Sequence, residues 1–409
     1  MKGLRFLLLF PLIGFSQAEA SHWYFGNGAG LIFDVNAGTV TSTNAASGTI
    51  NTSEGCSSIS DFNGNLLFYT DGRNIWDKNH TIMPNANYAA GTGLMGDPSS
   101  TSSGLIIPKP GNSDQYYVFT VDEPHHQNAF AFPNQGPANA AGNPVGTYDS
   151  GGSVPNADDG FNNGLAYTLV DLSLNAGDGD VVTSEKNIQL TTYDPSIQSQ
   201  NSYKCSEKIT AVEHSDGQSY WVVTHFRDRF YSFRVEASGV NTTAVVTTTT
   251  TLISELGYRR NAIGYMKASP DGTKIALCHR QNGTAQGQNS NNTGSVMLYD
   301  FDNATGLVSN PTNLYPNSGP YGVEFSQEST KLYVTANQSV IQFDLEAANP
   351  AQTINTVYNG FDFIGALQLG PDGKIYVANT DNYATMDVIN APDEAGVLCD
   401  YTYAGITLA

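Results

Sequence analysis

One short pattern recurs along the chain and constrains its fold more than any other feature. It consists of an apolar strand, a turn that contains Asp-Gly, and a second strand of alternating polarity. The pattern is complete from Ile364 to Ala378, where the turn is Pro371-Asp372-Gly373, and it returns around Asp271-Gly272 and Asp216-Gly217. Asp-Gly between two apolar runs is a strong signal of a β-hairpin because both residues tolerate a positive φ. The sequence therefore predicts a repeat built from hairpins.

The turns are spaced at a nearly constant interval. The last four, near residues 216, 271, 328 and 372, are 44 to 57 residues apart, and the first two, near 63 and 113, are 50 apart. Repeats of about 40–50 residues with several strands each and almost no helical pattern are typical of β-propellers. The longer gap between 113 and 216 contains a polar stretch rich in Gly, Asn and Pro, at about 122–163, which we interpret as an insertion in one blade.

Six turns predict six blades, and the strands at the two ends of the chain predict a seventh. We expect an all-β fold, a β-propeller of seven four-stranded blades, closed by the N-terminal strands around Trp23 and Phe33 together with the C-terminal segment from Val397 to Leu408. A β-sandwich or a right-handed β-helix is the alternative, although a β-helix needs a much shorter period. Small residues suit innermost strands that crowd the axis, and the predicted ones contain Gly55, Gly104, Ala211, Gly264, Gly322 and Gly365.

The first twenty residues have the pattern of a secretory signal peptide. Lys2 and Arg5 precede an apolar run from Phe6 to Phe15, which is followed by small residues. The run is shorter than the roughly 20 residues of a membrane span, so no membrane insertion is expected. The predicted organisation is a signal peptide over 1–20 and a single propeller domain over 21–409, secreted or located at the cell surface.

Composition narrows the class of partner. With 18 basic and 38 acidic residues the formal net charge is −20, which disfavours binding to nucleic acid. Charged residues make up only 14% of the chain. The four cysteines, Cys56, Cys205, Cys278 and Cys399, are scattered singly, without the paired spacing of a zinc site. Export permits disulfides, but three pairings are possible and free buried thiols remain an alternative.

Several short motifs follow one another in a fixed order from Trp23 onward. They are Trp23-Tyr24-Phe25-Gly26, Ser53-Glu54-Gly55-Cys56, Asn65 to Gly72, Ser99-Ser100-Thr101, Glu207 to Val212, Tyr220 to His225, and Gly365 to Ala378. Together they resemble the N-terminal propeller region of large secreted surface proteins of gliding-type Bacteroidota. The resemblance implies export, often with adhesive repeats and a sorting domain of the type IX secretion system downstream. Because the sequence stops at Ala409, it fits either a fragment of such a protein or a short relative.

Ligands of propellers bind where loops and innermost strands meet the axial channel, so the residues at the starts of those strands are the candidate binding site. They are Glu54, Thr101, Glu207, Lys208, Arg260 and Tyr321. Carboxylates, a cation and an aromatic ring can hold a sugar or a peptide by charge-assisted hydrogen bonds and stacking. The alternative is that Glu207 and Lys208, or Glu54 and Arg260, only neutralise one another.

Metal sites and catalytic motifs are weakly indicated. Neither the adjacent His125 and His126 nor the separate His214, His225 and His279 have the spacing of a zinc site. The run Asp171 to Asp180 places several oxygens close in sequence but lacks the ligand order of an EF-hand, so we expect a solvated turn, with a Ca²⁺ site as the alternative. The pairs Asp158-Asp159 and Asp300-Asp302 are interpreted in the same way. We expect no cofactor, and no nucleophile elbow or phosphate-binding loop is present.

Two functions remain after these exclusions. The first is a non-enzymatic scaffold for recognition or adhesion that binds a glycan or a protein at a cell surface. The second is a secreted propeller enzyme of the lactonase, hydrolase or polysaccharide-lyase kind, which would use acids in the axial channel. Propellers host many activities, so the fold cannot choose between the two. The absence of a catalytic motif favours the first.

Overall fold

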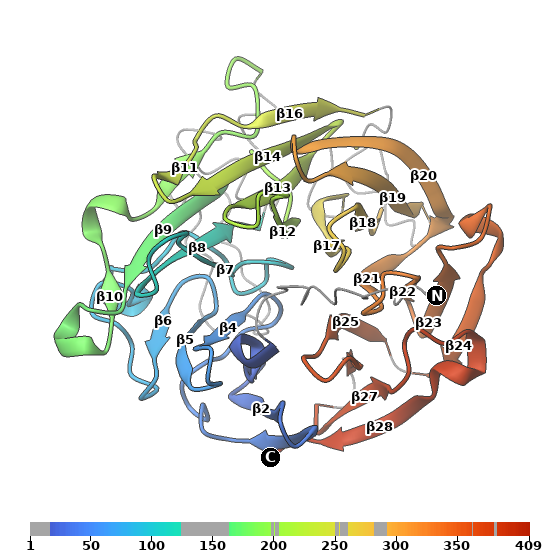
Figure 1. Cartoon of the computed structure of the whole chain (residues 1–409), viewed down its shortest axis with the longest axis horizontal. Coiled ribbons are helices and arrows are strands. Elements are labelled where there is room, and N and C mark those ends of the chain that lie inside the picture. Colours follow the sequence, from blue (N-terminus) through green and yellow to red (C-terminus); the bar gives the residue numbers. More distant parts are fainter. Residues whose placement is uncertain are drawn as a thin grey trace, which may run out of the picture.

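The computed structural model describes residues 17–123, 163–197, 200, 204–249, 253, 261–281, 293–361, 363–379 and 383–409. These residues form seven antiparallel sheets arranged around a central axis, with the colours of the chain running once around the ring (Figure 1). The seven-bladed propeller predicted from the repeat is confirmed. The described blades contain three to five strands each.

The strands follow one another blade by blade. Blade 1 contains β1 (His22–Phe25), β2 (Ala29–Asp34) and β3 (Thr39–Thr43), and blade 2 contains β4 (Ser57–Ser60), β5 (Leu66–Thr70) and β6 (Ile75–Asp77). Blade 3 contains β7 (Leu105–Pro108), β8 (Gln115–Val121), β9 (Leu165–Asp171), β10 (Asp180–Val181) and β11 (Ile188–Leu190). Blade 4 contains β12 (Ile209–Glu213), β13 (Tyr220–Phe226), β14 (Arg229–Glu236), β15 (Gly239–Val240) and β16 (Val245–Thr248).

The remaining three blades have four strands each. Blade 5 contains β17 (Met266–Ala268), β18 (Lys274–His279), β19 (Gly294–Asp302) and β20 (Leu307–Ser318). Blade 6 contains β21 (Pro320–Phe325), β22 (Lys331–Ala336), β23 (Ser339–Asp344) and β24 (Asn355–Asn359), and blade 7 contains β25 (Ile364–Leu369), β26 (Ile375–Asn379), β27 (Thr385–Ile389) and β28 (Tyr401–Thr407). The chain also forms short 3-10 helices: η1 (Gln17–Ala20), η2 (Tyr88–Ala90), η4 (Asn175–Gly177), η5 (Thr183–Glu185), η6 (Pro350–Gln352) and η7 (Gly396–Cys399).

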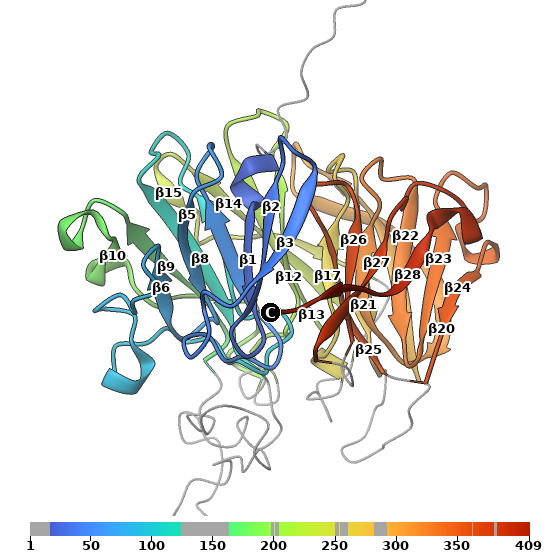
Figure 2. The same cartoon turned by 90° about the horizontal axis from the view of Figure 1, so that it is seen from below.

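The ring has two unlike faces. The turns between the first and second strands of blades 2 to 7 lie on one face, which we call the turn face. The connections between blades, and those between the second and third strands, lie on the other, which we call the loop face. Figure 2 shows the ring from the side, with the turn face, marked by the blue η1 and the dark red η7, at its upper edge.

The predicted composition of the closing blade was wrong. Strands β1, β2 and β3 form a sheet of their own, and the C-terminal β28 pairs with β27 in blade 7. The start of β1 lies beside the turn that follows β4, because a Cβ on Gly64 would approach Ser21 to 3.1 Å. The end of β1 lies beside the start of β4, where the Thr52 N–H donates to the Gly26 carbonyl. Thus β1 runs opposite to β4, and blade 1 contains the equivalents of the second to fourth strands of the other blades.

Blades 1 and 7 meet through aromatic side chains. Trp23 and Phe33 of blade 1 each place a ring edge-on against Tyr376 of β26, at 5.4 Å between centroids. The same cluster includes Leu31, Met386 and Val388. Burial of such side chains contributes about 1.5–3 kcal/mol each. Closure of the ring therefore depends on packing between two sheets, because among the described strands none belongs to both blades.

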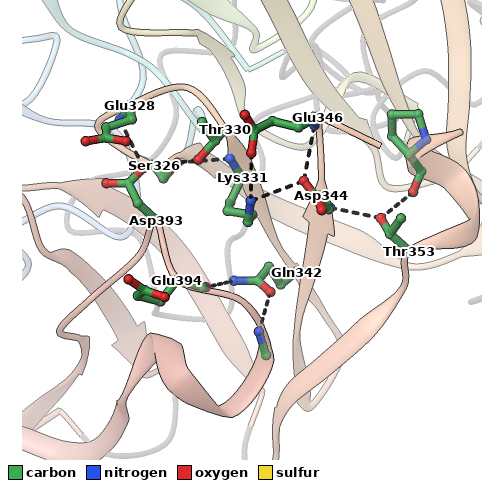
Figure 3. Close-up of polar contacts among 12 residues, drawn as sticks. Ser326, Glu328, Thr330, Lys331, Gln342, Asp344, Glu346, Thr353, Asp393 and Glu394 are labelled. Carbon is green, nitrogen blue, oxygen red and sulfur yellow. Dashed lines mark hydrogen bonds and ion pairs between the residues drawn. The ribbon is translucent and has the colours of Figure 1, made fainter. Parts of the chain in front are cut away.

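Neighbouring blades are also joined by polar contacts on the turn face (Figure 3). The buried Gln342 of β23 donates to the Glu394 carbonyl at 2.7 Å and accepts from the Gly396 N–H at 2.8 Å, so blade 6 holds the connection that leads into β28. Asp393 accepts from the Glu328 N–H at 3.0 Å. Lys331 makes an ion pair with Asp344 at 3.1 Å within blade 6. These contacts fix the connection between β27 and β28 against the hairpin turn of the preceding blade.

Candidate functional site

Side chains from the starts of five blades meet on the axis, on the loop-face side of the channel. We call this set, formed by Glu54, Thr101, Glu207, Tyr265 and Tyr321, the Thr101 cluster. The Thr101 hydroxyl donates to Glu207 Oε2 at 2.6 Å and lies 3.3 Å from Glu54 Oε2. The Thr101 N–H donates to the same oxygen of Glu207 at 3.0 Å, and the Gly264 N–H of the blade 5 segment reaches Thr101 Oγ1 at 3.5 Å. These contacts join blade 3 to blades 2, 4 and 5.

The two carboxyl groups of the cluster share one proton donor. Burial, together with repulsion from Glu207 and Glu123, raises the pKa of the Glu54 carboxyl well above its usual value. Hydrogen bonds from Tyr321 and Thr101 act in the opposite direction and are too weak to offset burial. Since the cost of two adjacent buried carboxylates is high, the arrangement favours a state in which one of them carries a proton. A protonated carboxyl can both donate and accept a hydrogen bond.

Two tyrosines form the aromatic part of the cluster. The rings of Tyr265 and Tyr321 are edge-to-face at 5.5 Å between centroids, and the Tyr265 N–H donates to the Tyr321 carbonyl at 2.8 Å. Burial, then the charge of Glu54, raises the pKa of Tyr321 well above its usual value, so its hydroxyl keeps its proton. Both residues, like Glu54, are half-buried, whereas Thr101 and Glu207 are fully buried. Glu54, Tyr265 and Tyr321, the members of the cluster with some exposed surface, therefore form its accessible side.

Lys208 holds a neighbouring segment in place. Its side chain is fully buried, and Nζ donates to the carbonyls of Ile263 at 3.1 Å, Asn261 at 3.4 Å and Ala262. Burial lowers the pKa of this amine to about 8, although Glu207 acts to raise it. The ammonium thus links blade 4 to the segment that enters β17. Lys208 therefore has a structural role through its hydrogen bonds to these carbonyls, in addition to its charge interaction with Glu207.

Two buried histidines lie in the second strands of blades 4 and 5. The rings of His225 and His279 are 5.2 Å apart between centroids, and both side chains have no exposed surface. No described residue hydrogen-bonds to their ring nitrogens. Burial, then the nearby Lys208, lowers the pKa of His225 to about 3 and that of His279 well below its usual value, so both rings are neutral. Among the described residues, no group of three or more His, Cys, Asp or Glu could hold a metal ion.

The structure brings five of the six predicted site residues together. Glu54, Thr101, Glu207 and Tyr321 belong to the cluster. Lys208 follows Glu207 in sequence and is close enough for the charge of Glu207 to act on its pKa. Arg260 lies outside the described residues. Sequence reasoning missed Tyr265 and Glu123. Tyr265 could have been found from the sequence. It is a tyrosine beside a glycine at the start of an innermost strand, like Tyr321, which lies beside Gly322.

A second polar group lines the channel closer to the turn face and was also missed. Lys267 of β17 pairs with the buried Glu324 of β21 at 3.1 Å and donates to Gln368 Oε1 of β25 at 2.5 Å. Glu324 also accepts from the Leu369 N–H at 3.1 Å. Each of the three polar residues follows a buried apolar residue in sequence: Lys267 follows Met266, Glu324 follows Val323, and Gln368 follows Leu367. The group ties three innermost strands together.

The remaining predicted groups are dispersed. The aspartates of the 171–180 loop face different partners, Asp171 with Gln115, Asp178 with Lys78 and Asp180 with Asn85. Asp300 is paired with Lys274, and Asp302 accepts from the Ala304 N–H. His214 contacts Asp216. All four cysteines are free thiols, three of them buried. His125, His126, Asp158, Asp159 and most of the predicted insertion lie outside the described residues.

Comparison with known proteins adds little about function. No protein-family model matches the chain, and no curated protein matches its sequence. The chain is similar to a Bacteroides fragilis protein named as a candidate 6-phosphogluconolactonase, with 12% identity, a TM-score of 0.48 and coverage of 95% of this chain and 94% of that one. It is also similar to hydrazine synthase of Kuenenia stuttgartiensis (11% identity, TM-score 0.47, coverage 95% and 100%). A Pseudomonas aeruginosa periplasmic gluconolactonase gives 15% identity, a TM-score of 0.35 and coverage of 68% and 65%. Likeness at this level carries no conclusion about activity.

Proposed function

We propose that this protein is an exported recognition scaffold that binds a glycan or a protein at a cell surface through the accessible side of the Thr101 cluster. The pattern of residues 1–20 and the resemblance to surface proteins of gliding-type Bacteroidota support export. The described residues contain no helix long and apolar enough to cross a membrane. The net charge of −20 favours ligands other than nucleic acid.

The observation that carries the proposal is the convergence of five blades on Thr101. Thr101 contacts Glu207 of blade 4 and Gly264 of the segment that enters blade 5, and neither Thr101 nor Glu207 has exposed surface. A substrate would have no direct access to Glu207, whereas Glu54 and the two tyrosines each have a small exposed surface. A rigid floor with a few accessible polar and aromatic groups suits binding, because such groups orient a ligand without losing conformational freedom.

Ligand capture by the purified protein tests this proposal. Glycan-array and pull-down screens of the wild type are compared with Glu54→Gln and Tyr321→Phe, after thermal unfolding has shown that both variants fold. Glu346→Gln, on the turn face, is the matched control. We expect capture of one ligand class that falls about tenfold or more in the two cluster variants and is unchanged in the control. Repeated failure of the wild type to capture any ligand would contradict the proposal, as would full capture by Glu54→Gln.

One observation favours a second candidate, a secreted enzyme. A carboxyl whose pKa is raised by burial and by a neighbouring carboxyl, as in Glu54, has the property of a general acid. Turnover of lactone and glycoside substrates by the wild type, abolished in both Glu54→Gln and Glu207→Gln, would favour this candidate. Binding without turnover would favour the scaffold.

A further inference from the structure

Three large aromatic side chains are exposed on the loop face of blade 7. Phe361 is 95% exposed, Tyr383 84% and Phe363 50%. Phe361 and Phe363 lie in the connection that enters β25, and Tyr383 lies in the connection from β26 to β27. The register Ile364↔Asn379 and Ala378↔Met386 brings both connections to the same end of the blade. Solitary exposed aromatics are common on protein surfaces, but three on one blade end are a distinct surface feature. We call them the aromatic trio.

The backbone on either side of Phe361 and Phe363 is hydrogen-bonded to blade 6. The Gly360 N–H donates to the Gln338 carbonyl and the Ile364 N–H to the Asn337 carbonyl, both at 3.0 Å. The Gln338 amide donates to the Phe361 carbonyl at 2.6 Å. The turn of blade 6 thus fixes both ends of the connection that carries Phe361 and Phe363. Aromatic side chains on an ordered backbone lose little freedom on contact with a ligand, which increases their contribution to binding.

The trio and the Thr101 cluster lie on the same face and are joined by two innermost strands. A Cβ on Gly322 would lie 2.7 Å from the Gly365 carbonyl, so β21 and β25 are in close contact at this point. Tyr321 precedes Gly322, and Phe363 stands two residues before Gly365. Tyr321 of the Thr101 cluster and Phe363 of the trio therefore come just before the place where the two strands are in contact. This proximity is the basis for a ligand that spans the cluster and the trio.

The surface area of the trio distinguishes between a protein partner and a smaller ligand. An aromatic side chain buries about 150–250 Å² on full contact, so three at these exposures offer on the order of 450 Å². A stable protein interface, including one with a second copy of this chain, needs about 800 Å² per partner. The trio is too small for such an interface, and its flat apolar rings match the C–H faces of sugar rings. Glu54 and Tyr321, which have some exposed surface, carry a carboxyl group and a hydroxyl group of the kind that sugar hydroxyls bind.

From these observations we propose that the loop face binds a neutral oligosaccharide, which stacks on Phe361, Phe363 and Tyr383 and places a terminal sugar at Glu54 and Tyr321. This inference rests on the proposed recognition function and narrows it to one ligand class. The net charge of −20 disfavours sulfated and sialylated chains. Stacking on several rings favours an extended chain of sugars over a monosaccharide.

The test uses four neutral hexasaccharides, of β-1,4-glucose, α-1,4-glucose, β-1,3-glucose and β-1,4-mannose, with a sulfated hexasaccharide and hexalysine as charged probes. Isothermal titration calorimetry measures their binding to the wild type, Phe361→Ala, Tyr383→Ala and the double variant. Phe62→Ala is the matched control, because Phe62 is 74% exposed but lies in the turn between β4 and β5 on the opposite face. Glu54→Gln reports on the cluster separately.

We expect at least one neutral hexasaccharide to bind, with about tenfold weaker affinity in each single aromatic variant and no change in Phe62→Ala. Equal affinity of the wild type and the double variant would overturn the inference, as would binding of only the sulfated probe or only hexalysine. If affinity falls in Glu54→Gln but not in the aromatic variants, the recognition function stands and the stacking surface is wrong. If the wild type binds none of these probes and captures nothing in the screens described above, both proposals fail.

Discussion

On the turn face, each Asp-Gly turn is held by hydrogen bonds within a few residues of itself, whereas on the loop face the side chains that meet come from five blades. Asp271, for example, accepts from the Thr273 N–H at 3.0 Å and from the Ser269 hydroxyl at 2.6 Å. Thr101 and Glu207, by contrast, are separated by 106 residues. The hairpin turns of the turn face are thus specified largely by local contacts, whereas the Thr101 cluster forms only when five blades have come together. Substitutions on the two faces should differ accordingly.

The largest expected effect is on the loop-face side, in Lys208→Met. The change removes the ammonium group that donates hydrogen bonds to the backbone carbonyls of Asn261, Ala262 and Ile263. Those carbonyls then lose this donor inside the protein. We expect a loss of about 3–5 kcal/mol in the free energy of unfolding, measured by urea denaturation. Lys274→Met is the control on the turn side, where the pair with Asp300 is partly exposed and should contribute at most about 1 kcal/mol. Equal losses in the two variants would remove the proposed distinction between the faces.

Gln342→Ala tests whether the turn face also contains contacts between blades that matter. The substitution deprives the Gly396 N–H and the Glu394 carbonyl of their partners in the contacts shown in Figure 3. We expect a loss of about 2 kcal/mol, because buried groups without partners are costly. Differential scanning calorimetry measures it. A loss below about 0.5 kcal/mol would mean that the turn face is held by its local turns alone.

Gly272→Ala measures the contribution of one local turn. Gly272 has φ +70°, and an added Cβ would approach Asn303 Nδ2 to 3.1 Å. Since an L-residue in this region costs about 1–2 kcal/mol, we expect a loss near 1 kcal/mol in the free energy of unfolding. Gly91→Ala, with a similar φ of +78° but no atom within 4 Å, separates backbone strain from crowding. No measurable loss in either variant would show that these turns do not require glycine.

The smallest expected effects are opposite pH dependences of the two faces. The pKa of Glu54 is raised in the folded protein, so its protonated form stabilises the fold, and stability should fall as the pH rises from about 4.5 toward the raised pKa. The pKa of Asp271 is lowered by hydrogen bonds that outweigh burial, so its contribution should be present above about pH 4 and be lost on further acidification. Urea midpoints measured from pH 3 to 8 should flatten above pH 4.5 in Glu54→Gln and below pH 4 in Asp271→Asn. The same slope in a variant as in the wild type would contradict the assignment.

The parts of the fold that were predictable from the sequence depend on contacts between residues close in the chain. The hairpin of Ile364 to Ala378 was predicted strand by strand, because Asp-Gly specifies the turn and alternation specifies the faces. The composition of the closing blade was not predictable in this way. The direction of β1 relative to β4 is set by contacts such as that of Thr52 with Gly26, and no local pattern encodes them.

The candidate site was predictable by position but not by geometry. The rule that innermost strands begin at the channel located Glu54, Thr101, Glu207 and Tyr321, yet it could not show that one hydroxyl would join two carboxyl groups. Lys267 and Glu324 were missed because each lies on a strand of three to six residues, where alternation is too short to separate channel from core. The aromatic trio was missed because it lies in connections, where sequence has no periodicity to interpret.

Blade 1 gives the ring a seam. Neighbouring blades elsewhere in the ring are consecutive in the chain, but among the described residues no connecting segment leads from blade 7 to blade 1. These two blades can therefore separate by losing side-chain contacts such as those of Trp23 and Phe33 with Tyr376, with every ladder hydrogen bond intact. The ring is thus closed at this point by the packing of aromatic and apolar side chains. Thermal fluctuations that widen the ring should therefore begin between its first and last blades, and amide exchange in β1 should be the first to report them.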